Sequence, residues 1–133
     1  MIRLATLFLA FAAPVSAQSL QQRLQVGQAW EVALAEWSVV LTCSMLDPQS
    51  REVAEDSWTR MRDAALDRMQ EAGWTEPDLD QLRDRGRIAA MRLPGDPPFS
   101  EVVAYCTDNG DWMQGLVRLT VPMLDRDVEA ALQ

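Results

Sequence analysis

Lysine and histidine are both missing from this chain of 133 residues, and its positive charge is carried by arginine alone. Without histidine, the usual Ser-His and Cys-His nucleophilic pairs and histidine-containing zinc sites are excluded. The chain contains two cysteines, Cys43 and Cys106. They are much farther apart in the sequence than the two cysteines of a C-x-x-C thiol redox motif. No glycine-rich phosphate loop occurs. We therefore predict no catalytic residue, no metal site and no cofactor.

The charge balance is acidic, with 20 Asp and Glu residues against 12 arginines and a formal net charge of −8. Loss of a leader containing Arg3 would make the net charge about −9, since one positive charge is removed. An acidic chain without lysine is poorly suited to phosphate-rich surfaces. We therefore expect neither nucleic acid nor an anionic membrane as a partner.

The first 17 residues contain the three regions of a secretory signal peptide. Met1–Arg3 is a short positive start, Leu4–Ala13 is almost entirely apolar, and Val15–Ala17 is a small-x-small cleavage site. The apolar run falls short of the roughly 20 residues that a membrane-spanning helix needs. The alternative, an N-terminal core helix, is disfavoured because charge, length and cleavage site agree. We predict cleavage of residues 1–17, a single domain over 18–133, and a periplasmic or secreted protein with no stable membrane span.

Export also bears on the two cysteines, because an oxidising compartment and an even count predict a disulfide between Cys43 and Cys106. The closed loop is long, and the chain-entropy model gives roughly 4 kcal/mol of stabilisation as an upper figure. The alternative is two buried free thiols.

Apolar residues recur every three or four positions along residues 18–133, which is the spacing of one helix face. We predict an all-α fold, a small bundle of four to five helices around a central buried helix, with one long-range disulfide. The segment Ala29–Leu46 is apolar on nearly all sides and is predicted to be the central helix. Its two charged residues, Glu31 and Glu36, and its short uncharged run argue against a membrane span. This segment belongs to a first helix that is predicted to begin after Ser19 and to present inward Leu20, Leu24, Gly27, Trp30, Leu34, Trp37, Leu41 and Met45.

Capping residues mark the limits of the next helices. Ser19 is expected to cap the first helix, and Asp47 to cap a second over about Pro48–Ala72. Gly73 is expected to end that second helix, and Thr75 to start a third. The third helix is predicted to present Leu79, Leu82, Gly86, Ala89 and Leu93 inward.

Two shorter helices follow the proline-rich segment 94–98. Ser100 is expected to cap the fourth helix and Asp111 the fifth, which ends near Pro122. The last segment, Met123–Leu132, is predicted to be helical with a tendency to fray. The predicted inward residues of these helices are Phe99, Val102, Val103 and Cys106, then Trp112, Leu116 and Leu119.

Carboxylates are the abundant reactive groups. Asp78, Asp80 and Asp84 alternate with arginines along the third predicted helix, which favours a solvated face laced with charges. The segment 108–111 has a calcium-like composition but lacks EF-hand spacing, so a turn between helices is the simpler interpretation. A general acid–base pair assembled from distant carboxylates remains an open alternative.

Tryptophan and methionine are the other residues that could form a functional surface, and the chain contains five tryptophans and seven methionines. Most of the tryptophans fall on predicted inward stripes or caps, so core packing is their first interpretation. A small domain has little room for five indoles, and we predict that some remain exposed for a partner. The predicted partner patch contains Trp58, Trp74, Trp112 and Met113.

A resemblance to a group of known proteins rests on four features of the sequence. They are the leader, the segment Trp37–Cys43, the segment Val102–Cys106, and Tyr105-Cys106 followed by Gly115–Leu119. Together they resemble small, uncharacterised exported helical proteins of α-proteobacteria from domain-of-unknown-function families. This resemblance implies a disulfide and a periplasmic setting. Val103–Thr107 is similar to the second cysteine segment of the periplasmic acid-stress chaperones, which are also short and helical with one long-range disulfide.

Three functional hypotheses follow. The first is a soluble periplasmic protein-binding module, immunity-like or chaperone-like, whose partner is another envelope protein. In its chaperone version, carboxylates protonate below about pH 3 and self-repulsion loosens the core. The alternatives are a carboxylate-based hydrolase acting in the envelope and a helical carrier of a small apolar ligand.

Overall fold

The computed structural model describes residues 19–88, 92–93, 95–121 and 123–133. These residues form six α-helices and one short 3-10 turn, with no strand among them, so the all-α prediction is confirmed, although there are more helices than the four to five predicted. The elements in chain order are α1 (Leu20–Cys43), η1 (Ser44–Leu46), α2 (Pro48–Glu71), α3 (Glu76–Ile88), α4 (Phe99–Asp108), α5 (Trp112–Thr120) and α6 (Leu124–Leu132).

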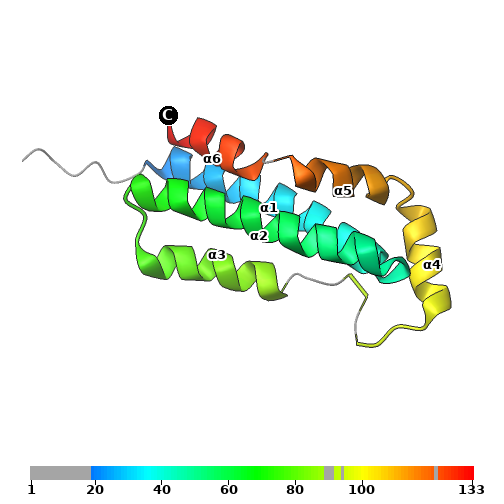
Figure 1. The fold of residues 1–133 in the computed structure, drawn as a ribbon. Helices are drawn as coiled ribbons and strands as arrows, with labels where there is room; N and C mark the ends of the chain where they lie inside the picture. The colour runs from blue at the N-terminus through cyan, green and yellow to red at the C-terminus, as the bar shows by residue number, and fades with distance from the viewer. Residues whose placement is uncertain (1–18, 89–91, 94, 122) are drawn as a thin grey trace, which may run out of the picture.

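The bundle is built on an antiparallel pair, α1 and α2 (Figure 1). Helices α5 and α6 follow one another along one side of this pair, and each contacts both α1 and α2. Helix α3 lies on the opposite side, and α4 crosses the end of the bundle where α1 finishes. The other helices thus surround α1 as predicted, although α2 shares its central position.

Helix α1 begins with a capping box, in which Ser19 and Gln22 exchange side-chain and backbone hydrogen bonds as the predicted cap requires. The prediction that Leu20 and Leu24 point inward is wrong, since they are 74% and 61% exposed. At 3.6 residues per turn, Leu24 lies about 120° around the helix from Trp30. Val26, close to the direction of Trp30, takes the inward position and is buried.

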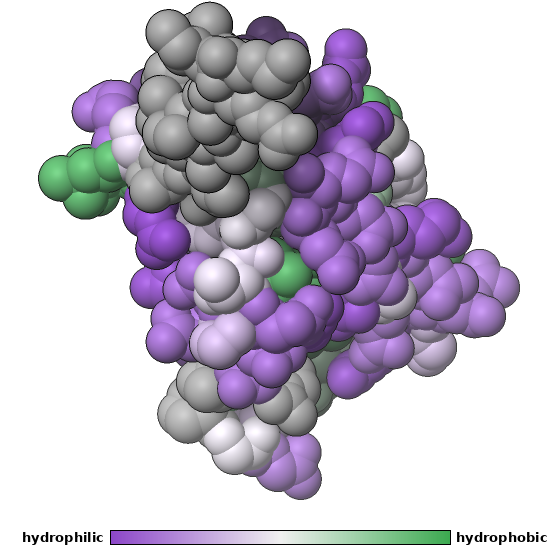
Figure 2. Space-filling view, turned by 90° about the vertical axis from the view of Figure 1, so that its left-hand side faces the viewer, coloured by the Kyte–Doolittle hydropathy of each residue, from purple (hydrophilic) through white to green (hydrophobic). Residues whose placement is uncertain are grey.

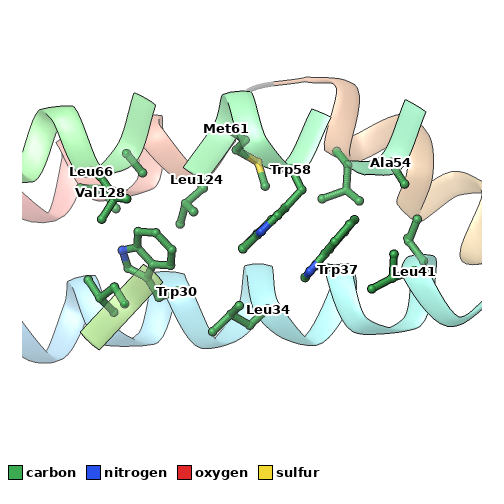
Figure 3. Close-up of a cluster of buried hydrophobic side chains, with 14 of the residues drawn as sticks. Trp30, Leu34, Trp37, Leu41, Ala54, Trp58, Met61, Leu66, Leu124 and Val128 are labelled. Carbon is green, nitrogen blue, oxygen red and sulfur yellow. The ribbon is translucent and has the colours of Figure 1, made fainter. Parts of the chain in front are cut away.

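Three tryptophans form the centre of the main core (Figure 3). The rings of Trp37 and Trp58 stack with centroids 5.4 Å apart and planes within 5°, and Trp30 meets Trp58 edge-on at 6.3 Å. Both geometries are favoured by the aromatic quadrupole. Side chains from α1, α2 and α6 enclose these rings, and those labelled in Figure 3 include Leu34, Leu41, Ala54, Met61, Leu66, Leu124 and Val128.

The turn between α2 and α3 follows the sequence prediction closely. Gly73 has a positive φ of 88°, and the Trp74 N–H donates to the Met69 carbonyl at 3.1 Å, which closes the end of α2. Leu79 and Leu82 are buried as predicted. The predicted inward residue Ala89 lies outside the described residues.

Helix α4 is fastened to the end of α1 by the Cys43–Cys106 disulfide, whose Cα atoms lie 5.6 Å apart. The predicted Ser100 cap is wrong, because α4 begins at Phe99, two residues earlier than a Ser100 cap requires, and Pro98 occupies the cap position. The predicted inward residues Phe99 and Val103 are exposed, because α4 packs mainly on α1 and η1, through the face that carries Val102 and Cys106.

Helices α5 and α6 complete the main core. The Asp111 side chain does not cap α5, because its backbone, at φ −88° and ψ 6°, is not in the extended conformation that side-chain caps adopt. Instead of fraying, α6 buries Leu124 and Val128 against both α1 and α2. Its contacts with the central pair are therefore the reason that this short helix is ordered.

One helical stretch, Leu20–Leu46, is long and apolar enough to cross a membrane, with a mean hydropathy of 1.3 in its most apolar window. Half of that window is buried inside the bundle, as in the core helix of a water-soluble domain. The predicted signal peptide, residues 1–17, lies outside the described residues and stays a prediction.

Candidate functional site

The four residues of the predicted partner patch do not share one surface. Trp58 is 4% exposed and sits between Trp37 and Trp30, so its place in a surface patch is a wrong prediction. Its inward helical spacing and the available stacking partners explain this burial. Trp74 is half-buried beside α1, Trp112 is half-buried near the disulfide, and Met113 is exposed on α5.

Exposed apolar side chains collect instead on α1, on α5 and on the connection from α5 to α6. Among the residues that the structure describes, seven of the ten large exposed hydrophobic ones lie there: Leu20, Leu24, Val32, Met113, Val117, Val121 and Met123. The other three are Val53, Phe99 and Val103. Met113 and Val117 are four residues apart on α5, so they form one outward stripe opposite its buried face, and Val121 follows directly after the helix ends.

The remaining surface is much more polar. Helix α2 carries ten charged residues among 24, and α1, of the same length, carries three. The end of the bundle where α1 begins is mostly hydrophilic in its described part, with hydrophobic residues in small separate areas (Figure 2). The side formed by α1, α5 and α6 therefore carries most of the large exposed apolar side chains of the described residues.

A groove runs along this side, and we call it the α1 groove. Its first part, about 400 Å³, lies between α1 and α6; its second, about 60 Å³, lies deeper beside Met61; its third, about 300 Å³, lies between α1 and α5. Val32 and Asp127 line both the first and second parts, and Glu36 and Arg118 line both the second and third. The three parts therefore adjoin one another.

Small residues shape the walls of the α1 groove. Ala29 lines it from α1, and Ala130 and Ala131 line it from α6. Gly115 brings α5 close to α1, because a Cβ atom there would lie 3.0 Å from the Val40 Cγ2 atom. Sequence reasoning missed this groove, although the alanines on α6 and the near absence of charge on α5 are signals that could have suggested it.

Charges in the α1 groove are arranged unevenly. In the second and third parts, Arg118 pairs with Glu36 and neutralises it. Near the third part, the backbone N–H of Arg92 donates to Thr42 Oγ1 at 2.9 Å, which connects the chain around Arg92 to α1. In the first part the ionisable lining residue is Asp127, whose carboxylate makes no ion pair within the part of the chain that the structure describes.

A second concavity of about 220 Å³ lies between α1 and α3. The Arg23 guanidinium covers the Trp74 ring at 5.2 Å and pairs with Asp78 at 3.5 Å. Arg85 pairs with Glu31 across the same seam at 2.9 Å. The charges of these residues are therefore paired with one another. We interpret the concavity as a contact between α1 and α3 that ion pairs stabilise, and not as a binding site with free charges.

The predicted carboxylate candidates lie in ordinary surroundings. On α3, Arg83 pairs with both Glu76 and Asp80, as expected for a charge-laced surface. The segment 108–111 is a turn between α4 and α5, in which Asn109 Nδ2 donates to the Tyr105 carbonyl. Among the described residues, no group of three potential metal ligands gathers at this turn or elsewhere.

The fold and surface define an all-α, disulfide-linked domain with a long groove on its less charged side. No family model, no curated protein and no solved structure matches the chain. The resemblances to α-proteobacterial exported proteins and to acid-stress chaperones therefore stay predictions.

Proposed function

We propose that this protein is an exported, periplasmic protein-binding module that docks another envelope protein along the α1 groove and the adjoining outward stripe of α5. One observation carries the proposal: exposed apolar residues converge on α1 and α5, whereas α2 and α3 are covered by charge. Exposed apolar area of this kind, rimmed by polar residues, typically marks an interaction surface.

The energetics of docking favour this side. Val32 and Val117 are 65% and 63% exposed, and full burial of such side chains contributes about 1.5–3 kcal/mol each. Covering α2 instead would desolvate many charged groups, which opposes binding. A partner that covers α1 and α5 therefore gains the most apolar burial for the least loss of hydration.

The two alternative functions find less support. A hydrolase needs two carboxylates in a cleft, at least one of them desolvated. Of the carboxylates that line the described concavities, Glu36 and Asp78 are ion-paired, and Asp111 and Asp127 belong to exposed residues. A carrier needs an enclosed apolar cavity, but the space between α1 and α2 is filled by the stacked tryptophans. Chaperone-like and immunity-like binding are both versions of the proposed docking.

Export is tested by expressing the full chain and fractionating the cells. We expect a periplasmic protein that begins at Gln18 and whose cysteines resist alkylation until a reductant is added. Intact protein in the cytoplasm, with Cys43 and Cys106 both alkylated at once, would contradict export.

Docking is tested with the oxidised protein immobilised and exposed to envelope extract, with retained proteins quantified by mass spectrometry. We expect Val32→Glu and Val117→Glu to lose a retained protein that wild type and Val53→Glu both keep. Val53→Glu is the matched control, because Val53 is also an exposed valine but lies on α2. Equal retention by all variants would overturn the assignment of this surface.

A further inference from the structure

We infer that the occupant of the α1 groove is an amphipathic helix that places a lysine or arginine against Asp127. This inference rests on the proposed docking function and specifies the chemistry of the partner.

The shape of the groove favours a helix as the occupant. Its α1 wall extends from Gln25 to Val39, which is about 21 Å, or about four helical turns. The alanines of the first part allow another backbone to approach closely, as helix packing at 8–10 Å requires. A peptide that binds by adding a strand needs a sheet edge for its backbone hydrogen bonds, and the described residues contain no strand.

The charge of the groove favours a basic occupant. A helix seated in the first part would take the Asp127 carboxylate out of water, and an uncompensated buried carboxylate is strongly disfavoured. The other residues lining this part are Gln25, Gln28, Val32 and alanines, so none of them offers a positive charge. Arg118 lines the adjoining second part together with Asp127, but it already pairs with Glu36. We therefore expect the positive charge that faces Asp127 to come from the partner.

The overall charge acts in the same direction. The chain has a net charge of −8 and no lysine, so a basic segment is attracted over a long range before it docks. Long-range attraction alone would favour any basic peptide at any acidic surface. The test must therefore separate a contact at Asp127 from net charge.

The probes are three fluorescent 18-residue helical peptides with one common leucine–alanine face and a polar face of lysine, glutamine or glutamate. Fluorescence anisotropy with the oxidised protein should show the lysine peptide binding about tenfold more tightly than the glutamine peptide, as for a charge-assisted contact, and the glutamate peptide most weakly. Asp127→Asn should remove most of the lysine preference. Glu129→Gln is the matched control, since it removes one negative charge from the same helix outside the groove.

The location is tested with Ala130→Trp, which fills the first part of the groove without changing charge. Its control is Ala104→Trp, because Ala104 is exposed on α4, away from the groove. We expect Ala130→Trp to abolish binding of the lysine peptide and Ala104→Trp to leave it unchanged. Circular dichroism and denaturation of each variant verify the fold.

The outcomes separate this inference from the proposed function. If the lysine preference survives Asp127→Asn, or falls equally with Glu129→Gln, it reflects net charge and the inference is overturned. If all three peptides bind equally and Ala130→Trp blocks them, the docking groove stands and the basic partner does not. If no peptide binds, while the envelope partner is retained through Val32 and Val117, docking stands and the helical occupant is overturned.

Discussion

The two ends of α1 belong to regions that hold together by different means. Over most of its length, α1 contributes to a main core made with α2, α3, α5 and α6, in which eighteen buried residues, three of them tryptophans, pack together. At its end, the α4 region buries only Cys43, Val102 and Cys106 as a separate small cluster. Apolar packing fastens the first region, whereas a covalent bond fastens the second.

This contrast shows what a disulfide supplies in a small domain. Helix α4 buries Val102 and Cys106 but leaves Phe99 71% exposed, so its apolar contact is too small to hold an isolated helix. The disulfide replaces the contact that α4 lacks. Removing the disulfide should therefore destabilise α4 first, whereas removing the tryptophan packing should destabilise the whole bundle.

The largest effect is expected from Trp58→Ala, which removes the ring that both Trp30 and Trp37 contact. The free energy of unfolding should fall by about 3–5 kcal/mol, because a buried aromatic side chain and its stacking are lost. Chemical denaturation followed by circular dichroism measures it. Trp58→Phe keeps a ring and should lose clearly less; equal losses would mean that stacking is unimportant here.

The disulfide is tested with the double variant Cys43→Ala/Cys106→Ala. Global stability should fall by at most about 4 kcal/mol, the chain-entropy value for this loop, while the tryptophan core stays folded. Near-ultraviolet circular dichroism of the tryptophans should persist, and hydrogen exchange should become fast in α4 alone. Loss of protection throughout the bundle would show that the two regions are not separable.

Tyr105 gives an optical probe of the α4 region, because it is the one tyrosine of the chain. Burial raises the pKa of its hydroxyl above the ordinary 10.0, although nearby Arg92 opposes the shift. The stability that this group contributes is present below pH 10 and is lost as the pH rises through the folded pKa. Absorbance titration of the double cysteine variant should give a lower tyrosine pKa than the wild type, and an unchanged value would mean that α4 stays docked.

Two glycines sharpen the description of the main core. Gly115→Val should lower the free energy of unfolding by about 1–3 kcal/mol, because the added side chain would collide with Val40 and push α5 away from α1. Gly27→Ala should raise it by about 0.5–1 kcal/mol, because no atom lies within 4 Å of the added Cβ and α1 gains helix propensity. Denaturation midpoints measure both, and a stabilising Gly115→Val would contradict the tight α1–α5 seam.

The smallest effect is expected at Asp47, which caps α2. A hydrogen bond from the Ser50 hydroxyl is the main reason that the Asp47 pKa lies below its ordinary 3.8, with backbone N–H groups adding to it. This stabilisation is present above pH 3.8 and is lost as the pH falls through the lower folded value. Asp47→Ala should therefore destabilise at pH 7 and have a smaller effect near pH 2. An equal loss at both pH values would exclude a role for the carboxylate charge.

The parts of the fold that depend on local sequence could be predicted. The Ser19 and Asp47 caps and the Gly73 turn depend on a few neighbouring residues, and the structure confirms all three. The expected caps at Ser100 and Asp111 are absent because a cap also needs an extended backbone, which residue type does not ensure.

Tertiary packing decided the rest. Periodicity placed Trp58 on an inward stripe, but only the positions of Trp30 and Trp37 reveal that it is enclosed on both sides. The α1 groove depends on how α6 lies beside α1, a contact between residues about a hundred positions apart. No window along the sequence contains both of its walls.

The hydrogen bond from Gln22 Nε2 to the Leu132 carbonyl spans 110 residues, at 3.3 Å. Because α6 supplies Leu124 and Val128 to the main core it shares with α1 and α2, this core is complete only once residues 124–132 have been made. A ribosome-bound chain that still lacks α6 has no finished interior. On the proposed export route, that delay would keep the polypeptide loose enough to thread through a translocation channel before it collapses into its native shape.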